Sequence, residues 1–332
     1  MFFSVLFAAV VPGFIEPVEI YRQWKPDETL AYSVTSRLQI ESRTFLHPVY
    51  MPQTTKYAYK FTLEVTEVSS EGFAQVVYKK PTVVVTVPET AEKKSFDEIE
   101  EVNEHFELTI SPVNAVTDFK DLTPKKDDDD DGGGGSGRSL LSNISPGQSR
   151  AMQQRIGGVI GNIISEFYRL ANFSGGVDTM LDFSPRLSLF EVEPGDTWEH
   201  TASYQPQPLD GKPDKMAPQR IDYTMTYVGV QEVDGKKIHR LTSDLSLDTD
   251  IAPFLNGMLR MTTSQSGLKS FKLVLTAHID FDLDFETKHT LKAIATSEGH
   301  LSIEVTDIKD GPFQEIRVKG RTILKLDPGA DS

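Results

Sequence analysis

TLAYSVTSRLQIESR, residues 29 to 43, alternates apolar and polar side chains over most of its length. Side chains of a β-strand point in turn to its two faces, so this alternation predicts a long strand with one buried face and one face in water. The predicted buried face consists of Leu30, Tyr32, Val34, Leu38 and Ile40. The predicted wet face consists of Ala31, Ser33, Thr35, Arg37, Gln39 and Glu41.

The same period of two continues toward the middle of the chain. KYAYKFTLEVTEV, residues 56 to 68, is followed by the turn Ser70-Glu71-Gly72 and by FAQVVYKK, residues 73 to 80. Two alternating stretches joined by a short glycine-containing turn predict a β-hairpin. HFELTI, residues 105 to 110, predicts a further short strand that ends at Ser111-Pro112.

Beyond residue 185 the pattern of the first half returns. EPGDTWEHTASY, residues 193 to 204, is similar to KPDETLAYSVTS, residues 25 to 36, and a hairpin with the turn Asp234-Gly235 follows. Three long alternating strands come next, interrupted at Ser297-Glu298-Gly299 and at Asp310-Gly311-Pro312. The sequence therefore predicts two similar β-rich halves, at 20–123 and 185–327.

One long helix is predicted between the halves, over 145–172. Ser145-Pro146-Gly147-Gln148 combines an N-cap, a proline at the first helical position and a capping glutamine. Apolar residues then recur at helical spacing, and Gly157 and Gly161 would allow close packing on another backbone. The residues of this stripe that we name as ligand-groove candidates are Met152, Ile156, Val159, Ile160, Ile163 and Phe167.

The predicted fold class is therefore mainly β, of the α+β type. Long curved antiparallel sheets in two similar halves pack on one long central helix, because the apolar helix stripe needs a concave apolar cover. A second, shorter helix is predicted within residues 251 to 261. Residues 124 to 144 combine an aspartate run with a glycine run, which predicts a disordered linker.

Composition limits the compartment and the partners. The chain of 332 residues has no cysteine, which excludes disulfides and thiolate chemistry, and its formal net charge of −15 argues against nucleic acid and anionic membrane surfaces. The apolar run within residues 1 to 15 predicts a signal peptide, atypical because no basic residue precedes it, and hence export. The alternative is a buried first strand. No segment has the length of a transmembrane helix.

Chemical motifs do not stand out. No GxSxG elbow, P-loop, GxGxxG fingerprint or metal-binding histidine spacing occurs, so we expect no cofactor, no metal and no enzyme activity. Asp127 to Asp131 match only the start of a calcium loop, because Arg138 stands where that loop requires glutamate. His278, Asp280 and Asp282 predict the wet face of a strand rather than a cation site. Trp24 and Trp198 predict packing at strand starts rather than ligand stacking.

A family resemblance rests on the turns around the predicted helix. Ile110-Ser111-Pro112, the helix at 148–171 and Pro194-Gly195-Asp196-Thr197-Trp198 resemble the pattern of a bacterial family of exported β-rich proteins of unknown function. Asn114 stands where that family has glycine, and the Asp-Gly tract is an insertion. The family is similar in architecture to periplasmic lipoprotein carriers, in which a curved sheet wraps around a helix. The resemblance implies an apolar groove and supplies no catalytic residue.

Three function hypotheses follow. The first is a non-enzymatic exported protein that binds a lipid, another hydrophobic or amphipathic ligand, or a partner protein. The second is a structural or scaffolding protein of the cell envelope, in which the helix and the sheet only fill each other. The third is a hydrolase whose site the sequence does not reveal, since such sites are recognised by geometry.

Overall fold

The part of the chain that the structure describes forms one antiparallel sheet of 11 strands. The computed structural model describes residues 17–87, 95–124, 160, 161, 163, 164, 167, 168, 171, 185–204, 219–258, 262–308 and 311–327. Within them the strands are β1 (Thr29–Thr44), β2 (Met51–Val68), β3 (Ala74–Val87), β4 (Phe96–Ile110), β5 (Val116–Asp121), β6 (Thr197–Tyr204), β7 (Gln219–Val233), β8 (Lys236–Asp250), β9 (Leu268–Asp284), β10 (Thr290–Val305) and β11 (Gln314–Leu326). The expected signal peptide and most of the expected linker lie outside the described residues.

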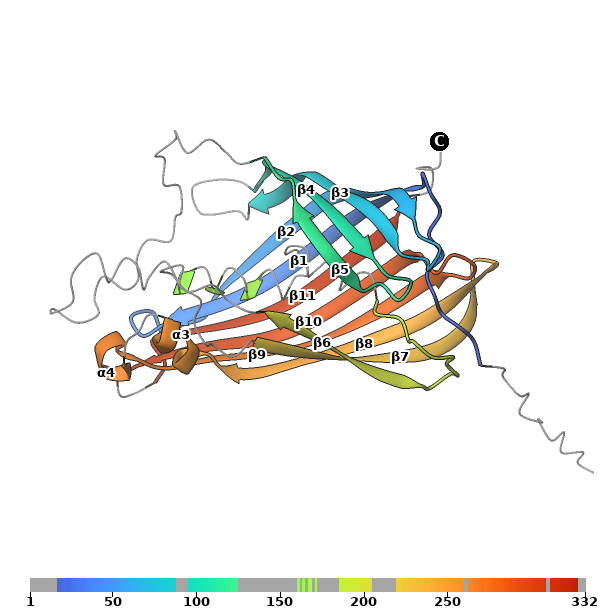
Figure 1. Ribbon diagram of the computed structural model, residues 1–332. Helices are drawn as coiled ribbons and strands as arrows, with labels where there is room; N and C mark the ends of the chain where they lie inside the picture. Colours follow the sequence, from blue (N-terminus) through green and yellow to red (C-terminus); the bar gives the residue numbers. More distant parts are fainter. Residues whose placement is uncertain are drawn as a thin grey trace, which may run out of the picture.

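The two predicted halves belong to a single sheet. Its strand order is β5-β4-β3-β2-β1-β11-β10-β9-β8-β7-β6, so β1 pairs with β2 on one side and with β11 on the other. Figure 1 shows that this sheet is strongly curved. The similar stretches at the starts of the halves occupy different positions, because β1 is central whereas β6 forms an edge and pairs only with β7.

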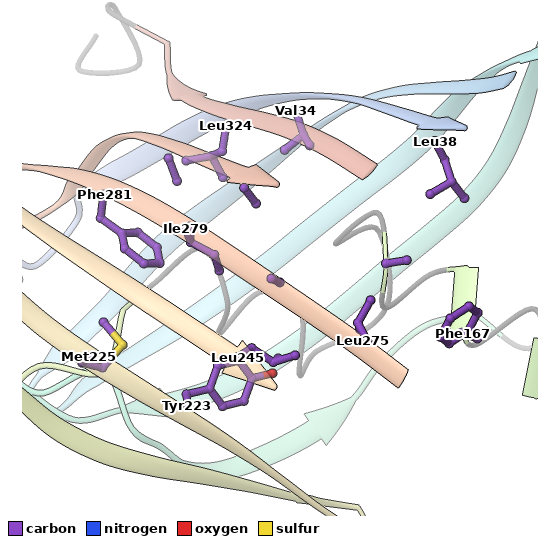
Figure 2. Packing of buried hydrophobic residues seen from close by; sticks show 14 of the residues in the cluster. Val34, Leu38, Phe167, Tyr223, Met225, Leu245, Leu275, Ile279, Phe281 and Leu324 are labelled. Atoms are coloured by element: carbon purple, nitrogen blue, oxygen red, sulfur yellow. The ribbon is translucent and has the colours of Figure 1, made fainter. Parts of the chain in front are cut away.

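The alternation read from residues 29 to 43 is confirmed. Leu30, Tyr32, Val34, Leu38 and Ile40 are buried on the inner, concave face of β1, while Arg37, Gln39 and Glu41 on the outer face are exposed. The same parity in β9 buries Leu275, Ile279 and Phe281. Figure 2 shows the inner side chains Val34 and Leu38 of β1 and those of β9 together with side chains of β7, β8 and β11. The hydrophobic core therefore lies inside the curve of the sheet.

Several predicted strand limits were wrong. The strand expected over 105–110 starts at Phe96, the strand expected over 73–80 continues to Val87, and β5 was not predicted at all. Ser297-Glu298-Gly299 is not an interruption but lies in the middle of β10. Its glycine serves a close side-chain contact within the sheet, which is the other common use of glycine in a strand.

A long central helix is not shown. Two short helices have defined limits in the described part of the chain, α3 (Ala252–Met258) and α4 (Thr263–Ser266). The first lies inside the shorter helix expected over 251–261. Of residues 145 to 172, the structure describes Ile160, Gly161, Ile163, Ile164, Phe167, Tyr168 and Ala171, all with helical backbone. The other residues of that expected helix lie outside the described residues.

The sheet has two unlike ends. One end, which we call the strap end, carries the β4–β5, β7–β8 and β9–β10 turns together with an extended strap, residues 17–28. The opposite end, which we call the loop end, carries the β1–β2 and β10–β11 connections and the helices α3 and α4 (Figure 1).

Candidate functional site: the concave face of the sheet

The centre of the concave face is lined by small side chains. Gly320 on β11 is the cross-strand partner of both Leu38 on β1 and Ser297 on β10, and Gly299 lies two residues further along β10. A Cβ atom at Gly299 would lie 2.8 Å from the ring of Phe167, and one at Gly320 would collide with the carbonyl oxygen of Ala171. The two glycines therefore let Phe167 and Ala171 approach the sheet backbone closely.

A hydrogen bond fixes the same contact. The hydroxyl of Ser297 donates to the carbonyl oxygen of Ala171. Next to it, the hydroxyl of Thr322 on β11 donates to that of Ser36 on β1 at 2.7 Å, so the buried polar groups of this region are paired. Ser36, Ser297 and Thr322 are all buried, although they lie on the apolar face. Their small size leaves space for the segment above them.

The structure brings three of the six groove candidates onto this face. Ile160 and Phe167 are buried, and Ile163 packs partly buried against the core. Met152, Ile156 and Val159 lie outside the described residues. The expected role of Gly161 is wrong, because Gly161 is exposed and no described atom lies within 4 Å of the position of an added Cβ. The sheet glycines provide the close approach instead.

A buried ion pair interrupts the apolar inner face between β3 and β4. The ammonium of Lys80 lies 2.7 Å from a carboxylate oxygen of Glu104, its cross-strand partner, and 5.1 Å from the centre of the Tyr59 ring. Each charge is therefore compensated by its partner in a region that is largely shielded from water.

Two tyrosines, Tyr57 on β2 and Tyr168, interact with each other. Burial, with the charge of Glu100 adding to it, raises the pKa of Tyr57. Burial also raises the pKa of Tyr168 to about 12, with a smaller contribution from Tyr57. Both phenols are therefore neutral at ordinary pH. This flank can present hydroxyl groups and one paired charge to a polar part of a ligand.

The strap closes the strap end of the concavity with a chain of buried polar groups. The Nε of Arg22 donates to Nδ1 of His289 at 2.9 Å, and its Nη1 donates to the side-chain oxygen of Asn114 at 3.2 Å. Because Nδ1 of His289 accepts a hydrogen bond, Nε2 carries the hydrogen and donates to Glu28 at 3.2 Å. The guanidinium of Arg22 also lies 4.0 Å above the ring of Trp24.

Backbone contacts hold the strap in place. The amide of Arg22 donates to the carbonyl of Pro112, and that of Gln23 donates to the carbonyl of Thr287. Asn114 has a φ of 60°, in the left-handed region that asparagine tolerates better than most residues. The strap thus joins the β4–β5 turn of the first half to the β9–β10 turn of the second.

The protonation states in this cluster follow from its burial. Burial lowers the pKa of His289 against the opposing effect of Glu28, so the imidazole is neutral at pH 7. Burial alone would raise the pKa of Glu28, but its hydrogen bonds with His289 and with the backbone amide of Lys25, together with the positive charge of Arg22, lower the net pKa. The arrangement therefore requires a neutral histidine between a cation and an anion.

The outer face agrees with the wet-face interpretation of the aspartates of β9. His278 and Asp280 are exposed, and His278 lies 2.7 Å from Asp244 of β8. Asp282 accepts two hydrogen bonds from Arg240, so the acidic row is partly neutralised by the neighbouring strand. Among the described residues, no group of three or more potential ligands could hold a metal ion, and no helix is long and apolar enough to cross a membrane.

Sequence reasoning missed the strap cluster and the glycines of the sheet. Arg22 and His289 are 267 residues apart, so no local spacing connects them. Trp24 and Trp198 do pack, as expected: Trp24 is buried under Arg22, and Nε1 of Trp198 donates to the carbonyl of Arg186 at 2.8 Å.

Comparisons with known proteins identify structural neighbours only. No protein-family model and no curated protein sequence matches the chain. A structure of lipovitellin, titled for lipid–protein interactions, is 12% identical with a TM-score of 0.37; the match covers 92% of this chain and 25% of the lipovitellin chain. The chain thus spans about a quarter of the length of that neighbour.

Two bacterial proteins of known structure also have low sequence identity to the chain. A DUF1329 family protein from Desulfovibrio piger is 9% identical with a TM-score of 0.16, covering 90% of this chain and 86% of that one. A putative outer membrane lipoprotein-sorting protein domain from Vibrio parahaemolyticus is 9% identical with a TM-score of 0.14 and has the same coverage of both chains. Likenesses of this size do not identify the family or the function of the chain.

Proposed function

We propose that the protein is a non-enzymatic, exported binding protein that holds a hydrophobic or amphipathic ligand against the concave face of its sheet. The observation that carries this proposal is the extent of the apolar inner face. Buried apolar side chains line it on β1 to β4 and on β7 to β11. The described helical residues contact this face at Ser297, Gly299 and Gly320 on β10 and β11, and Tyr168 interacts with Tyr57 on β2.

The chemistry of the face favours an amphipathic ligand over a purely apolar one. Lys80, Glu104 and the hydroxyls of Tyr57 and Tyr168 provide polar groups on the flank formed by β2 to β4. A site of this kind, mostly apolar with few polar groups, is typical of small-molecule binding. A partner protein that inserts an apolar segment would use the same face.

The alternative is a structural or scaffolding protein without a ligand. The hydrogen bond from Ser297 to Ala171 and the tight contacts at Gly299 and Gly320 favour it, since they resemble permanent core packing. A hydrolase is the second alternative, and panels of ester and peptide substrates would test it.

The experiment that separates ligand binding from permanent packing substitutes two adjacent residues. Ile160→Asp places a charge where the side chain is buried, and Gly161→Asp places the same charge where the backbone is exposed. If the segment moves aside for a ligand, Ile160→Asp keeps the far-ultraviolet β signal and the main melting transition, while binding of an apolar dye rises. If the segment is permanent core, the substitution lowers the free energy of unfolding by several kcal/mol and the variant unfolds.

Gly161→Asp should match the wild type in both assays. Native mass spectrometry of the purified protein, before and after delipidation, then looks directly for a bound lipid. Unfolding of Ile160→Asp together with the absence of any bound or rebinding lipid would overturn the proposal in favour of the scaffold.

A further inference from the structure

The β1–β2 loop at the loop end exposes an unusual concentration of large apolar side chains. Phe45 is 52% exposed, Leu46 63%, Val49 75% and Met51 65%. Single exposed apolar residues are normal on protein surfaces, but clustered ones indicate an interaction site. Four within seven consecutive residues form such a cluster, which we call the apolar loop.

The exposure of the apolar loop is built into its backbone. The amides of Thr44 and His47 each donate to the carbonyl of the other residue at 3.0 Å. The amide of Phe45 donates to the carbonyl of Phe313, at the β10–β11 connection, at 2.9 Å. The loop is thus anchored to the sheet while its apolar side chains point away from the core. A loop ordered in this way loses little conformational entropy when it binds.

A basic stripe runs along the outer face of the sheet from this loop. Its basic residues are Arg37, Arg43, Lys56, Arg317, Lys319 and Arg321, and the carboxylates among them are Glu41, Glu298 and Glu315. Basic residues therefore outnumber acidic ones here, although the whole chain carries a net charge of −15. The composition argued against anionic surfaces because it averages over this uneven distribution.

Within the stripe, three cations lie in direct register across three strands. Arg37 on β1 is the cross-strand partner of Lys56 on β2 and of Arg321 on β11. Like charges directly opposite one another destabilise a sheet, so an anion bound along the row would relieve the repulsion. Nearer the loop, the guanidinium groups of Arg43 and Arg317 lie 4.9 Å and 4.3 Å from the centre of the Tyr50 ring.

We propose that the apolar loop and the basic stripe together dock the protein on an anionic lipid surface. Phe45, Leu46, Val49 and Met51 enter the boundary between headgroups and acyl chains, and the stripe faces the anionic headgroups. Tyr50 with its two arginines lies between them, where aromatic and basic side chains are favoured at membrane interfaces. This inference goes beyond the proposed function and does not depend on a ligand in the concavity.

The test is vesicle co-flotation of the full chain. The vesicles contain either phosphatidylcholine alone or phosphatidylcholine with phosphatidylserine, each at low and high salt. The loop variant is Phe45→Ser with Leu46→Ser, and the stripe variant is Arg37→Gln with Arg321→Gln. The matched control is Leu189→Ser with Phe190→Ser, because these residues are 67% and 78% exposed at the strap end.

We expect the wild type and the control to float with the anionic vesicles, and less so at high salt. The loop variant should bind both vesicle types at least about tenfold more weakly, since two inserted apolar side chains are lost. The stripe variant should lose affinity only for the anionic vesicles. All variants should keep the wild-type melting midpoint within a few degrees, because the substituted side chains are exposed.

Three results would overturn the inference. The first is a wild type that stays unbound in the presence of phosphatidylserine. The second is a control variant that loses as much binding as the loop variant. The third is a wild type that elutes as a dimer and becomes monomeric only in the loop variant, because the loop would then bind a second copy of the chain.

Discussion

The two ends of the sheet differ in the kind of side chain that departs from the usual pattern of burial. At the strap end, polar and charged side chains are buried: Arg22 is 3% exposed and His289 4%. At the loop end, apolar side chains are exposed, as Val49 shows at 75%. The strap end thus buries a cluster of charged and polar groups, whereas the loop end exposes four large apolar side chains of one loop; Leu189 and Phe190 are exposed at the strap end as well.

The strap cluster is therefore expected to matter for stability, and the apolar loop for interaction. A buried charge is tolerated only where every neighbour compensates it, so the strap cluster should tolerate almost no substitution. An exposed apolar side chain adds little to folding, so the apolar loop can vary without loss of stability. Measurements at the two ends should therefore give effects of very different size.

The largest effect is expected from Arg22→Met. The substitution removes the cation that Asn114 and His289 bind, and it takes a nearby positive charge away from the partly buried Glu28. Breaking a buried polar network by removing one partner costs about 3 kcal/mol or more. Chemical denaturation of wild type and variant measures this cost. Arg321→Met, at an exposed outer position, is the control and should cost far less.

A second effect should appear on acidification of the strap end. The pKa of His289 is lower in the folded protein than in the unfolded chain, so the unfolded chain binds the proton more tightly. Stability is therefore complete above about pH 6.5, the ordinary histidine value, and falls as the pH drops toward the lowered pKa. The imidazole is surrounded by Arg22, Trp24, Glu28 and Asp284. A proton added to its Nδ1 would point at the Nε–H of Arg22, which donates to that nitrogen in the folded protein.

His289→Gln should reduce this acid dependence, because glutamine can donate and accept but does not titrate. A slope of the same sign should remain from buried His239, whose pKa burial lowers to about 4. His278→Gln is the control with the opposite sign. Its hydrogen bond and charge interaction with Asp244 raise the pKa of His278, so that histidine stabilises the protein below about pH 6.5 and the contribution is lost as pH rises. Melting midpoints recorded from pH 8 to 5 test both. An unchanged slope in His289→Gln would show that the strap cluster does not control the acid response.

The smallest effect is expected at the loop end. Phe45→Ser with Leu46→Ser should change the free energy of unfolding by less than about 0.5 kcal/mol, because neither side chain is part of the core. Denaturant titration without vesicles measures it. A loss comparable with that of Arg22→Met would mean that the apolar loop is a structural element, and the contrast between the ends would disappear.

The strands were predictable wherever one face is apolar over many residues. The parity of residues 29 to 43 placed every buried side chain of β1 that it named, because burial on one face forces a period of two. β5 was missed because its sequence, VTDFKD, is short, and its burial pattern shows that it buries none of its residues. The ends of β3 and β4 nearest the loop end were missed too, because they also bury no side chain among the described residues 81–86 and 96–101.

The site was only half predictable. The apolar stripe named Ile160 and Phe167, which are buried, since helical spacing is a local signal; their role in a ligand groove stays a prediction. The surfaces they contact were not found, because Ser297 and Gly299 have the composition of a turn and Gly320 shows no signal of its own. The strap cluster depends on pairing between distant segments, such as Glu28 with His289, and a single sequence does not reveal such pairs.

The pairing of β1 with β11 has a consequence for how the chain folds. Thr322 donates a hydrogen bond to Ser36 at the centre of the sheet, and these two residues are 286 positions apart in the sequence. Such non-local contacts give a high contact order, which slows folding because a large loop must close before the contact forms. Until β11 has been synthesised, β1 has an open edge and the apolar face is incomplete. We expect slow refolding, and aggregation of partly folded chains at high concentration, with closure of this central seam as the late step.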